Sequence, residues 1–288
     1  MNTRSIDLFE RERARLQRLA YRMLGSVSEA EDVVQDAWLR WDRAGEAAEN
    51  PQAWLMQTVT RLCLDRLKSA RARRETYVGP WLPEPLIEEM PEDPVERAED
   101  VSVAFLLALE RLSPLERAVF LLHDVFDQDY ADIARQLGRG EPAVRQLAAR
   151  ARGHVKDGRP RFTVSQEKTM QLAAAFMAAA VGNDTAQLSS LLAEDAVLIS
   201  DGGGKRPAAL RPMVGRDDVM GLISGIINTH GAFARPLAMR PALINGVPGV
   251  VMELEDGVQT MAFEAGDDGR LAAIYIMRNP DKLGHVRT

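Results

Sequence analysis

Three arginines and a glutamine lie within a short stretch near the middle of the chain, at Arg145, Gln146, Arg150 and Arg152. An arginine guanidinium can donate two hydrogen bonds to O6 and N7 of guanine, and a glutamine amide can pair with adenine in the same way. Arg152, further along, is better placed for a phosphate than for a base. These residue types indicate a DNA-binding segment; the alternative is a plain helical hairpin with solvated arginines.

The residues around this stretch predict the element that would present it. Apolar residues recur at helical spacing in two neighbouring segments, namely Tyr130, Ile133, Ala134 and Leu137 in the first and Val144, Leu147, Ala148 and Ala151 in the second. Gly138 and Gly140 mark a short turn between them, and Pro142 suits the first turn of a helix. Two short amphipathic helices joined by a glycine turn predict a helix-turn-helix. Upstream, Ser113 with Glu116 predicts a capping box that starts a helix running to about Val125.

A second basic stripe lies on a long helix predicted from about residue 52 to 74. One side of this helix is apolar and includes Leu55, while the other carries an aromatic followed by polar and basic residues, namely Trp54, Thr58, Arg61, Lys68, Arg71, Arg73 and Arg74. Cations can hold phosphates, and an aromatic ring can stack on an unpaired base. The alternative is that cations at a helix C-terminus only offset the helix dipole.

An acidic stripe lies on the helix before it. We expect that helix to begin at Ser28, with acids in its first turn. Asp32, Gln35, Asp36 and Leu39 then share one side, which is acidic with an apolar edge. Such a side suits a basic partner protein, although a solvated helix face is the alternative.

Composition and charge exclude several classes of protein. The 288 residues have a net charge of −6 and contain one cysteine, so no intrachain disulfide can form and a cytoplasmic setting is expected. The first 20 residues lack the apolar segment of a signal peptide, and the uncharged run at 169–183 is too short to span a bilayer. Residues 1–74 and 102–162 carry +3 and +2, and residues 75–101 carry −8. Two basic blocks therefore flank an acidic linker, and binding to nucleic acid depends on such local charge.

The linker at residues 76–101 contains five prolines, which exclude a continuous helix. It also carries Trp81, Leu82 and Pro83, which are unusual in an exposed acidic tether. We expect this segment to be ordered, with Trp81 either docked on a neighbouring domain or covering a local apolar cluster.

The pattern changes from helices to mostly strands after about residue 166. Two helices, a strand at 196–200 and a helix near 217–229 precede strand-like runs at 237–244, 249–254, 258–264 and 271–278. This order predicts an α+β domain. The loop Asp201, Gly202, Gly203, Gly204 and Lys205 lacks the spacing of a phosphate-binding loop. Either Lys205 meets an acidic surface, for which the acidic linker is the candidate, or the loop is a flexible hairpin. The sequence offers no convincing catalytic pair, cofactor site or metal cluster.

Several of these segments, in this order, resemble one protein family. Residues 29–38, residues 54–74 and residues 143–152 are similar to the polymerase-binding, minus-10-reading and minus-35-reading helices of extracytoplasmic-function sigma factors. Three further segments resemble the mycobacterial J-type subgroup, which carries a fused SnoaL-like domain. These segments are residues 81–86, the 201–205 loop and the run Asn279, Pro280, Asp281, Lys282 and Leu283.

The resemblance implies a multi-domain fold with two all-α sigma domains and a C-terminal α+β cone of the SnoaL and NTF2-like type. The implied domains are a region-2 domain at 1–75, the linker at 76–101, a region-4 domain at 102–160 and a SnoaL-like domain at 166–288. The implied partners are core RNA polymerase and promoter DNA with a TGTCACA-like minus-35 element, and a stress-response role is expected.

The resemblance also implies roles for the residues above. Asp32, Gln35, Asp36 and Leu39 would bind the polymerase, and the Trp54-to-Arg74 stripe would read and melt the minus-10 element. Primary sigma factors carry paired aromatics where this chain has Trp54 and Leu55, so replacing Leu55 with Trp is expected to relax promoter choice.

The resemblance also implies an interdomain regulatory contact formed by Trp81 to Pro83, the 201–205 loop and residues 279–283. Through this contact the C-terminal domain would regulate the factor in cis, and the domain is a candidate site for a small ligand. The competing hypotheses are a polymerase-independent helix-turn-helix regulator that senses a small molecule, and a SnoaL-type enzyme with a DNA-binding appendage.

Overall fold

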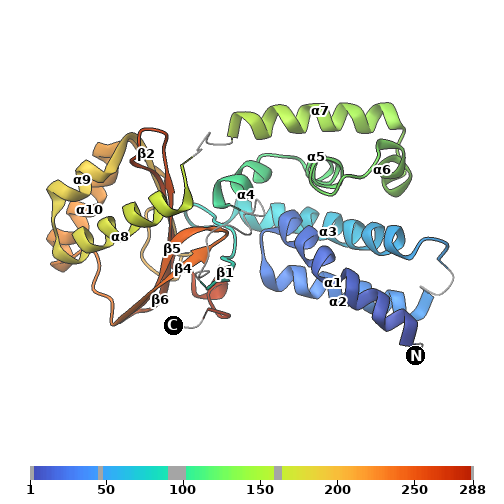
Figure 1. Cartoon of the computed structure of the whole chain (residues 1–288), viewed down its shortest axis with the longest axis horizontal. Coiled ribbons are helices and arrows are strands. Elements are labelled where there is room, and N and C mark those ends of the chain that lie inside the picture. Colours follow the sequence, from blue (N-terminus) through green and yellow to red (C-terminus); the bar gives the residue numbers. More distant parts are fainter. Residues whose placement is uncertain (1–2, 45–47, 90–101, 159–163, 287–288) are drawn as a thin grey trace. The chain divides into compact units, whose positions relative to one another are not determined.

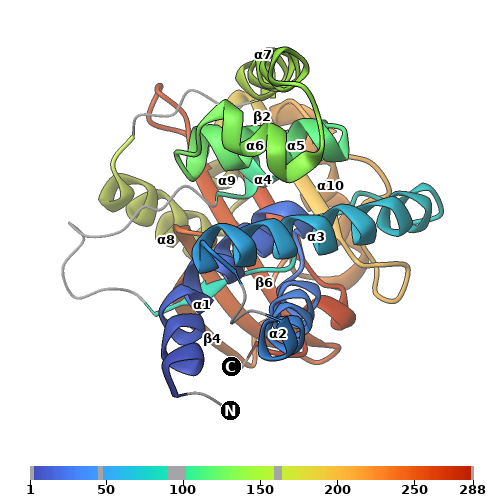
Figure 2. The same cartoon turned by 90° about the vertical axis from the view of Figure 1, so that its right-hand side faces the viewer.

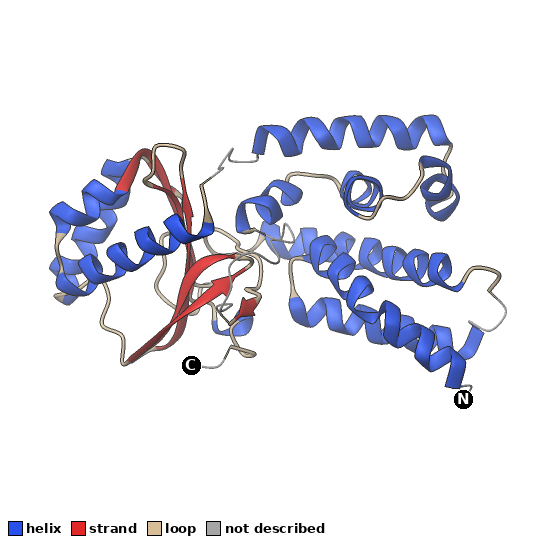
Figure 3. Ribbon diagram, viewed as in Figure 1, coloured by secondary structure: helices blue, strands red, loops and turns tan. Residues whose placement is uncertain are grey.

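The chain folds into two units, one helical and one built around a sheet (Figures 1 and 3). The structure is a computed structural model that describes residues 3–44, 48–89, 102–158 and 164–286. The first unit combines the chain before residue 77 with residues 104–159, and the second combines residues 77–103 with the chain after residue 159. The linker segment after residue 76 therefore belongs with the C-terminal domain rather than with the helices that it connects.

Three helices form the N-terminal half of the helical unit, and apolar side chains at helical spacing hold them together. These helices are α1 (Thr3–Leu24), α2 (Val27–Ala44) and α3 (Pro51–Glu75). Leu16, Val33 and Val59 are among the side chains that they bury completely. The start of α2 differs from the sequence prediction, because the side chain of Ser26, rather than Ser28, accepts the backbone N–H of Glu29 at 3.2 Å.

The second half of the helical unit contains the predicted helix-turn-helix (Figure 2). Its elements are α4 (Val103–Glu110), α5 (Pro114–Phe120), the π-helical turn η2 (Leu121–Val125), α6 (Tyr130–Leu137) and α7 (Glu141–Gly158). Ser113 and Glu116 make the predicted capping box at the start of α5. Gly138 adopts the left-handed conformation (φ 62°) that ends α6, which a residue with a side chain disfavours.

The second unit is the predicted α+β domain. Its elements are β1 (Ile87–Glu88), α8 (Gln166–Gly182), α9 (Thr185–Leu191), β2 (Leu192–Asp201), β3 (Met213–Val214), α10 (Arg216–His230), β4 (Ala238–Ile244), β5 (Val247–Leu254), β6 (Gly257–Ala265), β7 (Leu271–Met277) and η3 (Pro280–Lys282). The strands form one sheet in the order β1-β4-β5-β6-β7-β2-β3. β2 and β7 are parallel, and the other neighbours are antiparallel. The edge strand β1 comes from the linker.

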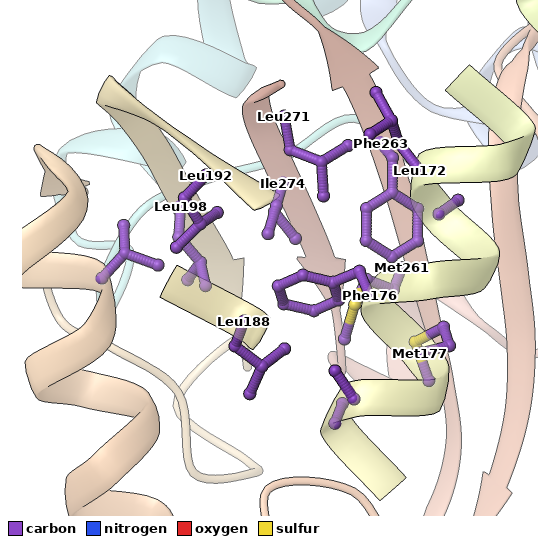
Figure 4. Close-up of a cluster of buried hydrophobic side chains, with 14 of the residues drawn as sticks. Leu172, Phe176, Met177, Leu188, Leu192, Leu198, Met261, Phe263, Leu271 and Ile274 are labelled. Carbon is purple, nitrogen blue, oxygen red and sulfur yellow. The ribbon is translucent and has the colours of Figure 1, made fainter. Parts of the chain in front are cut away.

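The core of this unit lies between one face of the sheet and the helices that cover it (Figure 4). Phe176 of α8 packs against Phe263 of β6, with ring centroids 5.5 Å apart, and Met261 and Ile274 lie beside them. A fully buried phenylalanine of this kind contributes about 3–5 kcal/mol, as judged by truncation to alanine. Large side chains therefore occupy the space between α8 and the sheet at these positions.

Candidate DNA and partner-protein interfaces

The predicted DNA-reading arginines are exposed on α7, and carboxylates of the same unit hold each of them. Arg145 Nη2 lies 2.5 Å from Glu141 Oε1, one turn earlier on α7. Arg150 Nε lies 3.2 Å from Glu116 Oε1, and Arg152 Nε lies 2.7 Å from Asp124 Oδ1. Gln146 is exposed on the same helix. Exposed ion pairs of this kind are weak, so a phosphate or a base edge can replace the carboxylates.

Glu116 has two tasks in this arrangement. Its carboxylate accepts the backbone N–H and the hydroxyl of Ser113, at 3.0 and 2.7 Å, and it pairs with Arg150. Burial alone would raise the pKa of Glu116, but the hydrogen bonds from Ser113 and the charge of Arg150 lower it overall. The start of α5 and the middle of α7 are therefore joined through one ionised side chain.

The predicted minus-10 side of α3 packs against the helix-turn-helix. Gln57 Nε2 and Arg61 Nη2 both donate to the backbone carbonyl of Gln136 in α6, at 3.1 and 3.3 Å. Trp54 lies one turn before them and packs against Trp41, with ring centroids 5.6 Å apart. Because these α3 residues are spaced three or four apart, they share one side of the helix. Two polar side chains on the side of α3 that would read DNA are thus held by α6.

Two expectations about α3 need correction. Thr58 is only 8% exposed, so in this arrangement its hydroxyl is not open to a base. Leu55 is completely buried in the core of the three N-terminal helices, so it is not the DNA-facing counterpart of a second aromatic. Lys68 is exposed and pairs with Asp65 at 2.9 Å. Arg71, Arg73 and Arg74 belong to the last turns of α3, and their side chains lie outside the described part of the structure.

A buried arginine provides a second link between the halves of the helical unit. Arg117 of α5 is 3% exposed and donates to the carbonyl of Met23, near the end of α1, at 2.8 Å. It also donates to the carbonyl of Leu109 and pairs with Glu110 at 2.7 Å. Burial lowers the pKa of Arg117, and these acceptors offset the cost of keeping the charged form buried.

The acidic side of α2 is accessible, as predicted. Asp32 and Gln35 are exposed, Asp36 is half-exposed, and Leu39 is 47% exposed. Arg66 of α3 donates to Asp32 at 3.5 Å and to Asp36 at 3.3 Å. One cation from the neighbouring helix therefore fixes the spacing of the two carboxylates without covering the stripe.

The linker docks on the C-terminal domain through the buried carboxylate of Asp201, which has no exposed surface. One oxygen accepts the Tyr77 hydroxyl at 2.6 Å and the Gly203 N–H at 3.0 Å. The other accepts the backbone N–H of Leu82 at 2.9 Å and Lys282 Nζ at 2.7 Å. Four donors thus satisfy this carboxylate, and two of them come from the linker.

Lys282 and Asn279 extend the same network. Lys282 Nζ also donates to the Leu82 carbonyl at 2.6 Å and lies 4.4 Å from the centre of the Trp81 ring. Asn279 Nδ2 donates to the Tyr77 hydroxyl at 2.7 Å. Burial, together with the hydrogen bond to Asp201, raises the pKa of Tyr77 and keeps its hydroxyl a donor at neutral pH. The structure therefore brings together Trp81, Leu82, Asp201, Asn279 and Lys282.

The rest of these motifs plays other parts in the same unit. Gly203 has a positive φ of 61°, and a Cβ there would collide with Asn279. Pro83 and Leu283 are buried, whereas Pro280 is exposed. Lys205 pairs with Asp281 at 2.7 Å, so among the described residues the acidic partner that it meets is in η3 and not in the linker.

A cavity of about 370 Å³ lies beside this network. The linker residues Val78 and Gly79 line one side of it, and Gly202, Gly204 and the 205–210 segment line the other. The docked linker therefore forms part of its wall.

Sequence reasoning missed several residues of the docking site. The backbone N–H of Asn245 donates to the Leu86 carbonyl at 2.8 Å, and the side chain of Asn245 accepts the Leu86 N–H at 3.3 Å. His285 contacts the Pro85 carbonyl at 2.8 Å and the Glu84 carboxylate at 3.2 Å. The Asn-Gly pair at 245–246, a strong signal for a tight hairpin, could have indicated the turn that receives the linker.

Comparison with known proteins agrees with this organisation. Residues 8–73 match Sigma-70 region 2, and residues 102–155 match Sigma-70, region 4. The chain is 39% identical to the extracytoplasmic-function RNA polymerase sigma factor SigJ of Mycobacterium tuberculosis, over 96% of this chain and 93% of SigJ. It is 32% identical to the probable sigma factor SigI of the same species, with the same coverage.

A solved structure supports the same assignment. The crystal structure of M. tuberculosis SigJ superposes with a TM-score of 0.77 at 36% identity, and the match covers 97% of this chain and 98% of that one. Among the described residues, no helix combines the length and apolar character needed to cross a membrane. The chain belongs to the extracytoplasmic-function RNA polymerase sigma factors.

Proposed function

We propose that this protein binds core RNA polymerase in the cytoplasm and directs initiation at specific promoters. The observation that carries the proposal is the exposed set Arg145, Gln146, Arg150 and Arg152 on the second helix of a helix-turn-helix. The accessible acidic stripe of α2 supports it, since a carboxylate pair with an apolar edge suits a basic surface of the polymerase.

The test is abortive transcription with purified core polymerase, the full-length chain and a promoter with a TGTCACA-like minus-35 element. Arg145→Ala should reduce the promoter-dependent product, because a bidentate arginine–guanine contact is worth about 1–3 kcal/mol. Arg270→Ala, which removes an exposed arginine from the C-terminal domain, is the matched control. DNA binding by the chain alone, without product, would instead favour a polymerase-independent regulator.

We further propose that the C-terminal domain regulates the factor in cis by shortening the linker. Residues 76–102, 27 in all, connect α3 to α4, and a chain of that length can span about 90 Å when fully extended. Docking fixes residues 77–88, 12 in all, on the C-terminal domain, so these residues can no longer extend to their full span of about 40 Å. Docking therefore limits how far the two DNA-binding domains can separate.

The packing of α6 on the minus-10 side of α3 supports this proposal. As long as Gln57 and Arg61 bond the Gln136 carbonyl, these two side chains are not available to DNA. Deleting the chain from residue 166 onward should therefore change promoter-dependent transcription. Identical activity of the truncated and full-length proteins would remove the regulatory proposal but leave the sigma-factor proposal intact.

A further inference from the structure

Tyr130 is the first residue of α6, and its side chain touches two of the arginines proposed to meet DNA. The guanidinium carbon of Arg145 lies 4.5 Å from the centre of the Tyr130 ring. Arg152 Nη2 donates to the Tyr130 hydroxyl at 2.9 Å. These arginines are seven residues apart, which is two helical turns or about 10 Å along one face of α7. One aromatic side chain therefore spans the distance between them.

The elements behind Tyr130 hold its ring in place. The His123 ring packs on it at 3.9 Å between centroids, and His123 Nδ1 lies 2.7 Å from the Gln128 carbonyl. His123 and Asp124 both belong to the π-helical turn η2, where the chain makes an i to i+5 hydrogen bond from Phe126 to Leu121 at 3.0 Å. Such turns carry an extra residue and are frequent at functional sites. Here η2 supplies both the support for the Tyr130 ring and the carboxylate that pairs with Arg152.

We propose that Tyr130 is a positioning residue of the minus-35 interface, which holds Arg145 for base contact and Arg152 for phosphate contact at a fixed separation. The proposal rests on the proposed function, because it requires that α7 reads DNA. The carboxylates of Glu141 and Asp124 compete with DNA for the same cations and must give way when DNA binds. Tyr130 is neutral, so its ring and hydroxyl can keep their contacts while phosphate or guanine replaces the carboxylates.

The two contacts can be separated by substitution at Tyr130. Tyr130→Phe keeps the ring beneath Arg145 and removes the acceptor for Arg152, whereas Tyr130→Leu removes both. Holoenzyme made with the full-length chain would be bound to two promoters, one intact and one with a substituted minus-35 guanine, at several salt concentrations.

Tyr130→Phe should weaken binding to both promoters alike, by about five-fold, as expected for one lost hydrogen bond. The plot of the logarithm of the binding constant against the logarithm of the salt concentration should also become less steep, as it should in Arg152→Ala. The change in slope should be smaller than about 0.9, the value for one lost phosphate contact. Tyr130→Leu should additionally reduce the preference for the intact promoter, as Arg145→Ala does. Tyr275→Phe, which removes a hydroxyl from the sheet of the C-terminal domain, is the matched control.

A double-mutant cycle decides whether Tyr130 acts through Arg152. In the Arg152→Ala background, Tyr130→Phe should have no further effect on binding. An undiminished five-fold loss in that background would overturn the proposal, as would a Tyr130→Leu holoenzyme with unchanged promoter preference. If Arg145→Ala and Arg152→Ala both bind promoters like the wild type, the proposed function of α7 itself fails. That result is distinct from the failure of the Tyr130 proposal, in which the losses from Arg152→Ala and Tyr130→Phe simply add.

Discussion

Replacing Asp201 with alanine should release the linker from the C-terminal domain. The linker supplies two of the four donors to this carboxylate, the hydroxyl of Tyr77 and the backbone N–H of Leu82. The other two, from Gly203 and Lys282, belong to the domain itself. The substitution therefore removes two bonds across the docking site and leaves Lys282 without its carboxylate.

The expected loss follows from those two bonds. A hydrogen bond to a charged group contributes about 1.5–3 kcal/mol, and because Tyr77 is half-buried we take the lower value for each. Two such bonds amount to about 3 kcal/mol, which shifts the ratio of docked to undocked linker by about 100-fold. Tyr77→Phe removes one of them and also the bond that Asn279 Nδ2 donates to the Tyr77 hydroxyl, so at about 1.5 and 1 kcal/mol it should shift the ratio by about 50-fold.

Amide hydrogen exchange at Asn245 measures this ratio, because the Asn245 N–H donates to the Leu86 carbonyl of the linker and neither substitution removes that bond. Exchange in the full-length chain should accelerate in the order wild type, Tyr77→Phe, Asp201→Ala. Asp268→Ala, which changes an exposed turn of the same domain, is the control, and amides of β6 report whether the sheet stays intact. Equal protection of the Asn245 amide in the wild type and in Asp201→Ala, with the sheet intact, would refute the assignment of Asp201 as the centre of the docking site. Under the proposed regulation in cis, Asp201→Ala should also raise promoter-dependent transcription.

Three further changes test other parts of the structure. Leu55→Trp should destabilise the helical unit by about 1–3 kcal/mol through overpacking, measured by chemical denaturation, and should not relax promoter choice. Ser113→Ala should cost about 1 kcal/mol in the same assay, because it removes the cap that Glu116 completes. Asp256→Asn should destabilise the C-terminal domain at neutral pH: burial alone would raise the pKa of Asp256, but the hydrogen bonds and charge of Arg206, helped by a second arginine, lower it overall. A carboxyl group whose pKa is lowered by folding stabilises the fold above its unfolded pKa, near 3.8, and this stabilisation is lost as the pH falls further. The difference in unfolding free energy between Asp256→Asn and the wild type should therefore shrink below about pH 4.

The parts of the fold that the sequence predicts are those set by local spacing. The helix-turn-helix follows from apolar residues at intervals of three and four and from Gly138, which takes the left-handed conformation that ends α6. The capping box at Ser113 and the four long C-terminal strands follow in the same way, because each depends on residues close together in the chain. The acidic stripe of α2 was predictable too, since helix geometry alone separates it from the buried side.

The parts that could not be predicted depend on residues far apart in the sequence. The carbonyl of Gln136 accepts side chains 75 and 79 positions away, and no pattern in α3 shows that its polar side is covered by protein. The partner of Lys205 is Asp281, although the acidic linker offered a larger number of carboxylates. Charge complementarity predicts only that a lysine will pair with some acidic side chain. Which acidic side chain it reaches depends on how the helices and strands pack.

The arrangement of the helical unit also limits how a partner can activate the factor. We call the arrangement in which α6 contacts α3 closed, and one in which these helices are apart open. The stripe of Asp32, Asp36 and Leu39 is already accessible in the closed arrangement, so a partner that contacts only this stripe binds both arrangements equally. Equal affinity shifts no equilibrium, however tight the binding. Reversing even a 99:1 preference for the closed arrangement requires about 5.5 kcal/mol of differential binding. That energy must come from binding to surfaces that are less accessible, or differently placed, in the closed arrangement. Two such surfaces are the Trp54-to-Arg61 side of α3 and the helix-turn-helix itself. Docking on the α2 stripe therefore recruits the factor to its partner, and separation of the two DNA-binding domains requires a second contact, made by the partner or by the promoter.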